Sequence, residues 1–263
     1  MEYIFKNQLL TSAVIVIAGL ALSGCSSSSS SSGGGVTVTS PDGIYLGNIT
    51  GGDVSSNGTE EKAIIYNNRM MVLSNNTDGV SQLFDANLTD QTMSLAGTGN
   101  RYAATGSEIN IITYTGSYVA GQTAAVDFVE SVSNLTGSMA FNFVPAVYAK
   151  GSDLTRLAGT WSGIFVAGSN ATMTLMIGAD GVIAAGSGDS GDGDCNFTGA
   201  FSILDATKNV YSLSLVSDGG GFGCFVSAGT YSGLAWTEGD TNGTLVLMAA
   251  DGNRGRAAVL TRN

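Results

Sequence analysis

Short runs of alternating apolar and polar residues cover the chain from Val36 onwards. Segments such as GIYLGNIT (43–50) and NVYSLSLVS (209–217) place Val, Ile, Leu and Tyr between Gly, Ser and Asn. This period of two is typical of half-buried β-strands, and no stretch sustains the 3.6-residue period of a capped helix. Asn67-Asn68 and Ala179-Asp180-Gly181 have the composition of hairpin turns. The pattern predicts an all-β protein.

The second half of the chain divides into eight such runs. The predicted strands are 159–166, 171–177, 182–186, 195–204, 209–216, 228–237, 243–249 and 256–262. Eight short antiparallel strands in a meander can close into a barrel, which leaves no exposed sheet edge.

Short matches at nearly constant offset suggest that the first half repeats this plan. Residues 43–47 match 159–163 at an offset of 116, and residues 113–116 match 230–233 at an offset of 117. Between them, Asp85-Ala86 and Ser94-Leu95 match Asp205-Ala206 and Ser214-Leu215 at an offset of 120. We therefore expect two tandem antiparallel meander barrels of about eight strands each, over residues 41–150 and 151–263. Chance similarity between β-rich segments, or one larger sheet, is the alternative.

Gly159-x-Trp161, together with Arg262 in the last predicted strand, resembles the lipocalin-like (calycin) superfamily. The resemblance implies that the tryptophan packs under the basic residue. Gly43-x-Tyr45 and Lys150 have comparable places in the first half. The segments GTW and GADG also resemble avidin-like barrels. The biotin site of that family uses several tryptophans and this chain has two, so biotin binding is not expected.

The N-terminal segment has the pattern of an export signal. Residues 9–22 are fourteen almost entirely apolar positions, which is short of the roughly 20 needed to span a bilayer. Leu22-Ser23-Gly24-Cys25 follows and resembles the lipobox of bacterial lipoprotein precursors. The resemblance implies that residues 1–24 are removed as a signal peptide and that Cys25 becomes the lipidated first residue. An uncleaved signal anchor is the alternative.

The residues after Cys25 have the composition of a flexible linker, which we place at 25–40. Ser26–Ser32 and Gly33–Gly35 form a tract that cannot pack a core, with a mean reach of about 18 Å. Ser26 stands where aspartate often marks inner-membrane retention. The lipoprotein resemblance therefore implies the outer membrane, at its periplasmic face or at the cell surface.

The remaining cysteines, Cys195 and Cys224, would lie in an exported compartment where disulfides persist. In the predicted meander, the connections that they flank emerge at the same end of the second barrel. We therefore expect a disulfide between them. Two buried free thiols are the alternative.

Composition excludes several kinds of chemistry. Gly188-Asp189-Ser190-Gly191 resembles the segment around a trypsin-like nucleophile, but the chain has no histidine to accept its proton. Three lysines (Lys62, Lys150 and Lys208) fall at expected strand edges or turns, where they would be solvated. The net charge of −11 argues against nucleic-acid binding.

Acidic residues cluster near the predicted disulfide. Asp189, Asp192 and Asp194 share one connection, and Asp218, Asp251 and Arg254 fall in connections at the same end. Clustered carboxylates suit calcium, although the spacing is not that of an EF-hand. A solvated acidic loop is the alternative, and no other cofactor is expected.

These observations predict a non-enzymatic, membrane-anchored lipoprotein of the cell envelope. It would bind a partner protein or a small ligand through its barrel loops. A structural envelope lipoprotein without a specific ligand is the alternative, and a hydrolase of unrecognised type is a further one. Because small residues are plentiful and aromatic residues few, we expect narrow, filled barrels.

Overall fold

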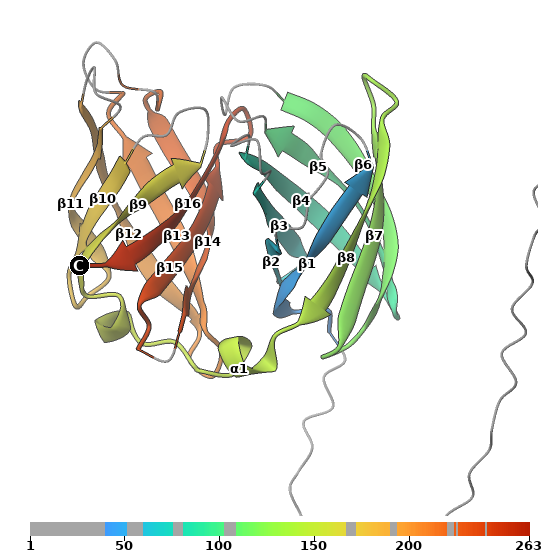
Figure 1. Ribbon diagram of the computed structural model, residues 1–263, viewed down its shortest axis with the longest axis horizontal. Coiled ribbons are helices and arrows are strands. Elements are labelled where there is room, and N and C mark those ends of the chain that lie inside the picture. Colours follow the sequence, from blue (N-terminus) through green and yellow to red (C-terminus); the bar gives the residue numbers. More distant parts are fainter. Residues whose placement is uncertain are drawn as a thin grey trace, which may run out of the picture. The chain divides into compact units, whose positions relative to one another are not determined.

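The computed structural model confirms the predicted fold class: two closed eight-stranded antiparallel barrels follow one another along the chain (Figure 1). It describes residues 40–51, 60–75, 81–102, 109–166, 172–189, 194–219, 224, 226–239 and 241–263. The predicted signal peptide, Cys25 and most of the linker lie outside these ranges. Within them, no helix has the length and apolar character that crossing a bilayer requires.

The first barrel is drawn from blue to yellow-green in Figure 1. Its strands are β1 (Gly43–Gly51), β2 (Glu61–Tyr66), β3 (Arg69–Asn75), β4 (Ser81–Gln91), β5 (Ser94–Tyr102), β6 (Ile109–Val119), β7 (Thr123–Glu130) and β8 (Thr136–Phe143). Each strand pairs with the next, and β8 closes on β1 with Phe143 opposite Tyr45.

The second barrel is drawn from yellow to red. Its strands are β9 (Gly159–Val166), β10 (Thr172–Ile177), β11 (Val182–Asp189), β12 (Asp194–Asp205), β13 (Val210–Ser217), β14 (Gly229–Glu238), β15 (Thr244–Ala250) and β16 (Gly255–Arg262). Each of the eight ranges predicted from sequence falls on one of them. The barrel closes through β16 and β9, with Arg262 opposite Trp161.

Two short helices connect the barrels. α1 (Pro145–Tyr148) begins at a proline, whose fixed φ and missing N–H suit a first helical position. The 3₁₀-helix η1 (Leu154–Arg156) is capped by Asp153, whose side chain accepts from the N–H of Thr155. Both helices are single turns, so the connection adds little core of its own.

The predicted hairpin turns form as expected. Asn67 and Asn68 join β2 to β3 with φ values of 49° and 63°, which is the left-handed pair that a tight type I′ turn needs. Gly181, at φ 82°, completes the turn between β10 and β11.

The three sequence matches lie on strands of equal rank in the two barrels. The first pair falls on β1 and β9, the second begins on β4 and β12, and the third falls on β6 and β14. These equivalent strands begin 116, 113 and 120 residues apart, so the offsets of the matches approximate the spacing of the strands without reproducing it at each pair.

Each barrel encloses its own cluster of buried side chains. Strand β7 shows the pattern, because Ala124, Val126, Phe128 and Glu130 point inward while the residues between them are exposed. Tyr45, Phe84 and Phe128 belong to the first interior, and Trp161, Phe197 and Tyr231 to the second. Burial of this apolar area is the main favourable contribution to folding.

A third cluster lies between the barrels. It unites outward-facing residues of both: Ile44, Ile64, Tyr66, Met71, Leu73, Leu83 and Tyr102 from the first, Tyr148 from α1, and Val210, Leu234, Trp236, Val246, Met248, Ala250 and Ala257 from the second. This contact explains why β15 is buried at six consecutive positions instead of alternating. The two barrels therefore share a core in addition to their separate ones.

Candidate functional site

A disulfide fastens one end of the second barrel, as the sequence predicts. Cys195, at the start of β12, is bonded to Cys224 in the connection between β13 and β14, with 5.0 Å between their Cα atoms. We call this end the disulfide rim, defined by Cys195, Cys224 and the strand ends beside them. The start of β12 and the connection between β13 and β14 are thus joined covalently.

Hydrogen bonds hold the same connection on both sides. The Ser217 hydroxyl donates to the carbonyl of Val226 (3.3 Å) and accepts from the N–H of Gly219 (3.2 Å). The hydroxyl of Tyr231, on β14, donates to the carbonyl of Ser227 (3.0 Å). Val226 is fully buried, so the connection is anchored by an apolar side chain as well.

The aspartates predicted near the rim serve the local backbone where their side chains are described. Asp218 accepts from the side-chain amide of Asn196 (2.8 Å) and from its N–H (3.3 Å). Asp251 accepts from the N–H groups of Asn253 (2.7 Å) and Arg254 (2.6 Å). Both carboxylates therefore shape the turns that contain or face them.

The calcium prediction at Asp189, Asp192 and Asp194 remains a prediction. Asp189 and Asp194 are backbone partners at the end of the β11–β12 hairpin, so their backbones are brought together. Asp192 lies outside the described residues. Within the ranges given above, no three cysteine or carboxylate side chains gather as a metal site requires.

Arg256 lies inside the second barrel, and we did not predict it. Its side chain is 1% exposed, and its guanidinium carbon lies 5.4 Å from the centroid of the Tyr231 ring. Burial lowers the pKa of this guanidinium below its ordinary value. The alternation of side chains along a strand could have revealed it, because Arg256 lies on the same face of β16 as the buried residues Ala258 and Leu260.

The opposite end of the second barrel carries the contact that the lipocalin-like resemblance implies. The Arg262 guanidinium lies over the Trp161 ring, 4.6 Å from its centroid, and donates to the carbonyl of Arg156. The Trp161 indole N–H donates to the carbonyl of Leu157 (2.7 Å). This end is thus closed by an aromatic ring, a cation and η1.

The comparable arrangement expected in the first barrel is absent at its named lysine. The Nζ of Lys150 donates to the carbonyl of Gly239 (2.5 Å), in the other barrel. Tyr45 instead packs edge-on against Phe143, with ring centroids 5.7 Å apart. Its hydroxyl donates to the carbonyl of Pro41 (2.6 Å). In the first barrel, Phe143 therefore packs on the aromatic ring where Arg262 does so in the second.

The first barrel buries a polar network inside. Arg101 forms an ion pair with Glu130 and donates to the side-chain oxygen of Gln82 (2.8 Å). The second carboxylate oxygen of Glu130 accepts from the hydroxyl of Ser133 (2.5 Å). The nearby Tyr114 hydroxyl is buried and has no hydrogen-bond partner among the described residues. Its pKa is raised, above all by burial.

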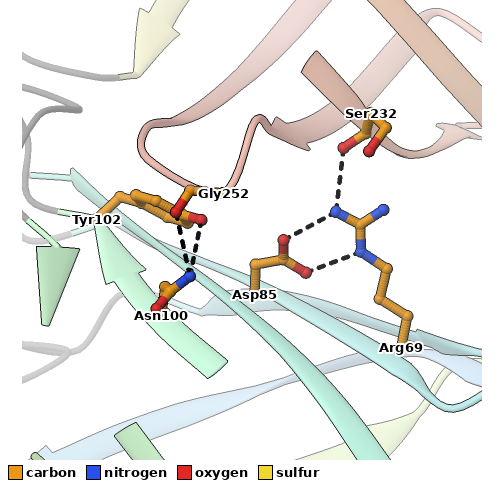
Figure 2. Close-up of polar contacts among 6 residues, drawn as sticks. All are labelled: Arg69, Asp85, Asn100, Tyr102, Ser232 and Gly252. Carbon is orange, nitrogen blue, oxygen red and sulfur yellow. Dashed lines mark hydrogen bonds and ion pairs between the residues drawn. The ribbon is translucent and has the colours of Figure 1, made fainter. Parts of the chain in front are cut away.

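Polar contacts join the barrels around their shared apolar cluster (Figure 2). Arg69 binds both carboxylate oxygens of Asp85 at 2.8 Å and donates to the carbonyl of Ser232 (3.0 Å). The side-chain amide of Asn100 reaches the carbonyl of Gly252 (3.5 Å). These contacts place first-barrel side chains against second-barrel backbone.

The lysines expected to be solvated have partners in the structure. Lys62 forms an ion pair with Glu238 at 2.6 Å, and the two side chains are only 19% and 21% exposed. Lys208 lies over the ring of Tyr148, 5.2 Å from its centroid. The expectation of a solvated side chain was wrong for Lys62, which lies where the two barrels meet, whereas Lys150 and Lys208 are half-buried.

A shallow depression of about 430 Å³ lies on the wall of the first barrel. It is lined by Thr50, Gly51, Asp127, Phe128, Val129, Thr136, Gly137 and Ser138. The hydroxyls of Thr50 and Ser138 bond each other across it (2.8 Å). None of these lining residues has a buried side-chain polar atom without a hydrogen-bond partner, in contrast to Arg256 and Tyr114 inside the barrels.

Comparisons with known proteins give no family. No protein family and no curated protein matches this sequence. Among solved structures, the chain is 14% identical to a Bacteroides fragilis protein described as an outer membrane protein, over 84% of this chain and 97% of that one, with a TM-score of 0.28.

Two structures of transferrin binding protein B are also similar. The Neisseria meningitidis protein is 12% identical over 78% of this chain, with a TM-score of 0.27, and a Haemophilus parasuis mutant is 8% identical over 76%, with a TM-score of 0.21. The chain spans only 58% and 59% of those two chains. Likenesses at such TM-scores carry no argument about function.

Proposed function

We propose that this protein is a non-enzymatic lipoprotein of the bacterial outer membrane, anchored by lipid on Cys25, which binds a partner protein through the disulfide rim. The anchor rests on the segment Leu22–Cys25 and on the Ser/Gly tract that follows it. The binding role rests on one observation, the disulfide between Cys195 and Cys224.

A fastened rim suits recognition for a physical reason. Loops that are already ordered lose less conformational entropy when a partner binds them, so more of the contact energy appears as affinity. The disulfide and the hydrogen bonds of Ser217 restrain the connection between β13 and β14 in this way. The barrel beneath supplies the rigid scaffold on which binding loops are commonly carried.

The shared core between the barrels supports the same proposal. Trp236 and Met248 of the second barrel belong to the same buried cluster as Ile64 and Met71 of the first. The first barrel thereby braces the wall of the second, and the linker at 25–40 gives the pair room above the membrane. The alternative is a structural lipoprotein without a specific partner, and such a role does not require a disulfide at the barrel rim.

Site-specific photocrosslinking in cells tests the binding role. A photoreactive side chain replaces Ala228 at the rim or, as the matched control, Ala206 in the turn between β12 and β13, at the opposite end of the barrel. Both alanines are exposed. We expect a discrete cross-linked protein with the Ala228 variant only. Equal cross-linking at both sites, or none at either, would contradict partner binding at the rim.

The anchor has its own test. Palmitate labelling and mass spectrometry of the mature N-terminus should find lipid on Cys25, and Cys25→Ser should abolish labelling and leave the protein unprocessed. A mature chain that keeps residues 1–24 refutes the anchor without bearing on the rim. The two halves of the proposal can therefore fail separately.

A further inference from the structure

Arg256 points into the interior of the second barrel. Successive side chains of a strand alternate between its faces, and Ala258 and Leu260 belong to the interior cluster, whereas Ala257 belongs to the cluster between the barrels. At 1% exposure, Arg256 is among the largest fully buried side chains of the protein. A guanidinium thus lies inside an otherwise largely apolar barrel.

In the part of the chain that the structure describes, the guanidinium meets neutral groups, the Gly255 carbonyl and the Tyr231 side chain. Nη1 donates to the carbonyl of Gly255 (2.8 Å), and the guanidinium faces the Tyr231 ring, but the Nε–H has no hydrogen-bond acceptor. Among the described residues, no carboxylate lies within ion-pair distance of it. Asp251 raises the pKa of Arg256 by its charge, but one of its carboxylate oxygens accepts the N–H of Asn253 in its own turn.

Arg101 is a second buried arginine of this protein, and its guanidinium has an anionic partner. That guanidinium, also buried, has the Glu130 carboxylate and the Gln82 side-chain oxygen as partners. A buried charge without such compensation destabilises the folded protein, and arginine cannot escape this by releasing its proton. Arg256 therefore differs from Arg101 in lacking an anion, not in burial.

Small residues lie beside Arg256 on the neighbouring strands. The register places Ala249 of β15 beside Arg256, and Gly233 of β14 beside Ala249. The two strand positions next to Arg256 in this row therefore carry no bulky side chain. The fork of a guanidinium matches the two oxygens of a carboxylate, which bind it more strongly than neutral acceptors do.

We propose that the interior of the second barrel binds a small carboxylate anion through Arg256. The Nε–H of Arg256 donates to the carboxylate, and the Tyr231 ring covers the guanidinium. The site lies inside the barrel below the disulfide rim, because Tyr231 also binds Ser227 of the rim connection. It does not rest on the proposed partner binding.

Nuclear magnetic resonance of the arginine Nε–H groups provides a direct test. Labelling with ¹⁵N-arginine gives six such signals from the full chain, and acetate, formate and phosphate are titrated at constant ionic strength. We expect acetate and formate to shift the Arg256 signal saturably and to leave the Arg101 signal in place. An Arg256 signal that ignores both carboxylates, or that responds to phosphate alone, overturns the proposal.

Thermal unfolding adds a second measurement with a matched control. Acetate at about 100 times its dissociation constant should raise the unfolding temperature by about 5–10 °C. Arg256→Met should abolish that rise, whereas Arg254→Met, two residues away, should keep it. A rise that persists in Arg256→Met reflects a general salt effect and refutes the site. Cross-linking through Ala228 should be unchanged in Arg256→Met, which separates this test from that of the rim.

Discussion

Lys62 of β2 and Glu238 of β14 form an ion pair between the two barrels, with Nζ 2.8 and 2.6 Å from the two carboxylate oxygens. The indole N–H of Trp236 donates to the same carboxylate (2.9 Å). Both charged side chains are largely shielded from water, so salt screens this pair less than it screens a surface pair. The pair fixes the edge of the shared apolar cluster that contains Trp236.

Lys62→Met should lower the free energy of unfolding by about 1–2 kcal/mol, because it leaves the Glu238 carboxylate half-buried with one neutral donor. A double-mutant cycle with Glu238→Gln should give a coupling energy of about 1 kcal/mol between the two sites. Urea unfolding measures both quantities. Additive effects of the two substitutions would show that the contact contributes nothing to stability.

Two buried tyrosines make a matched pair for a second prediction. The Tyr45 hydroxyl donates to Pro41, whereas the Tyr114 hydroxyl has no partner. Tyr114→Phe should therefore be neutral or stabilise the protein by about 1 kcal/mol, since it removes an unsatisfied polar group. Tyr45→Phe should destabilise it by about 1 kcal/mol. Chemical unfolding at neutral pH compares them, and equal losses would disprove the distinction.

The same tyrosines predict sensitivity to alkali. Burial raises the pKa of Tyr45, Tyr114 and Tyr148, while an unfolded chain releases these protons near pH 10. The stabilisation is therefore complete below about pH 10 and is lost as the pH rises towards the folded-state pKa values. The free energy of unfolding should therefore decrease between about pH 9 and 11, and it should decrease less steeply in the Tyr114→Phe variant. Parallel curves would exclude Tyr114 as a contributor.

The strands of the second barrel were predictable because their signal is local. Alternation and turn residues fix each range, and β9, at 159–166, has the predicted ends. The strand β15 was also predicted, but its burial on both faces was not, since TLVLMAA has the same composition whether one face or two are covered. What covers its outer face is a strand of the other barrel, far away in the sequence.

The candidate site was predictable only in part for the same reason. The pairing of Cys195 with Cys224 followed from their number and from the meander, which brings alternate connections to one end. No comparable rule indicates that Arg101 meets Glu130 while the Nε–H of Arg256 meets no acceptor among the described residues. Those pairings depend on which inward-facing residues of non-adjacent strands lie at the same height along the barrel axis. A sequence pattern of period two predicts which residues face inward, but it does not predict their height.

The disulfide supplies a final prediction, because it closes a segment of 29 residues. On the chain-entropy account, such a cross-link restricts the unfolded chain and stabilises the fold by about 3–4 kcal/mol. Replacing both Cys195 and Cys224 by alanine should cause a loss of that size in urea unfolding, and adding a reductant to the native protein should match it. The double variant itself should be insensitive to reductant, which separates the effect of the bond from other effects of the reagent. A loss below about 1 kcal/mol would mean that the hydrogen bonds of Ser217 and Tyr231 already hold the rim without the covalent link.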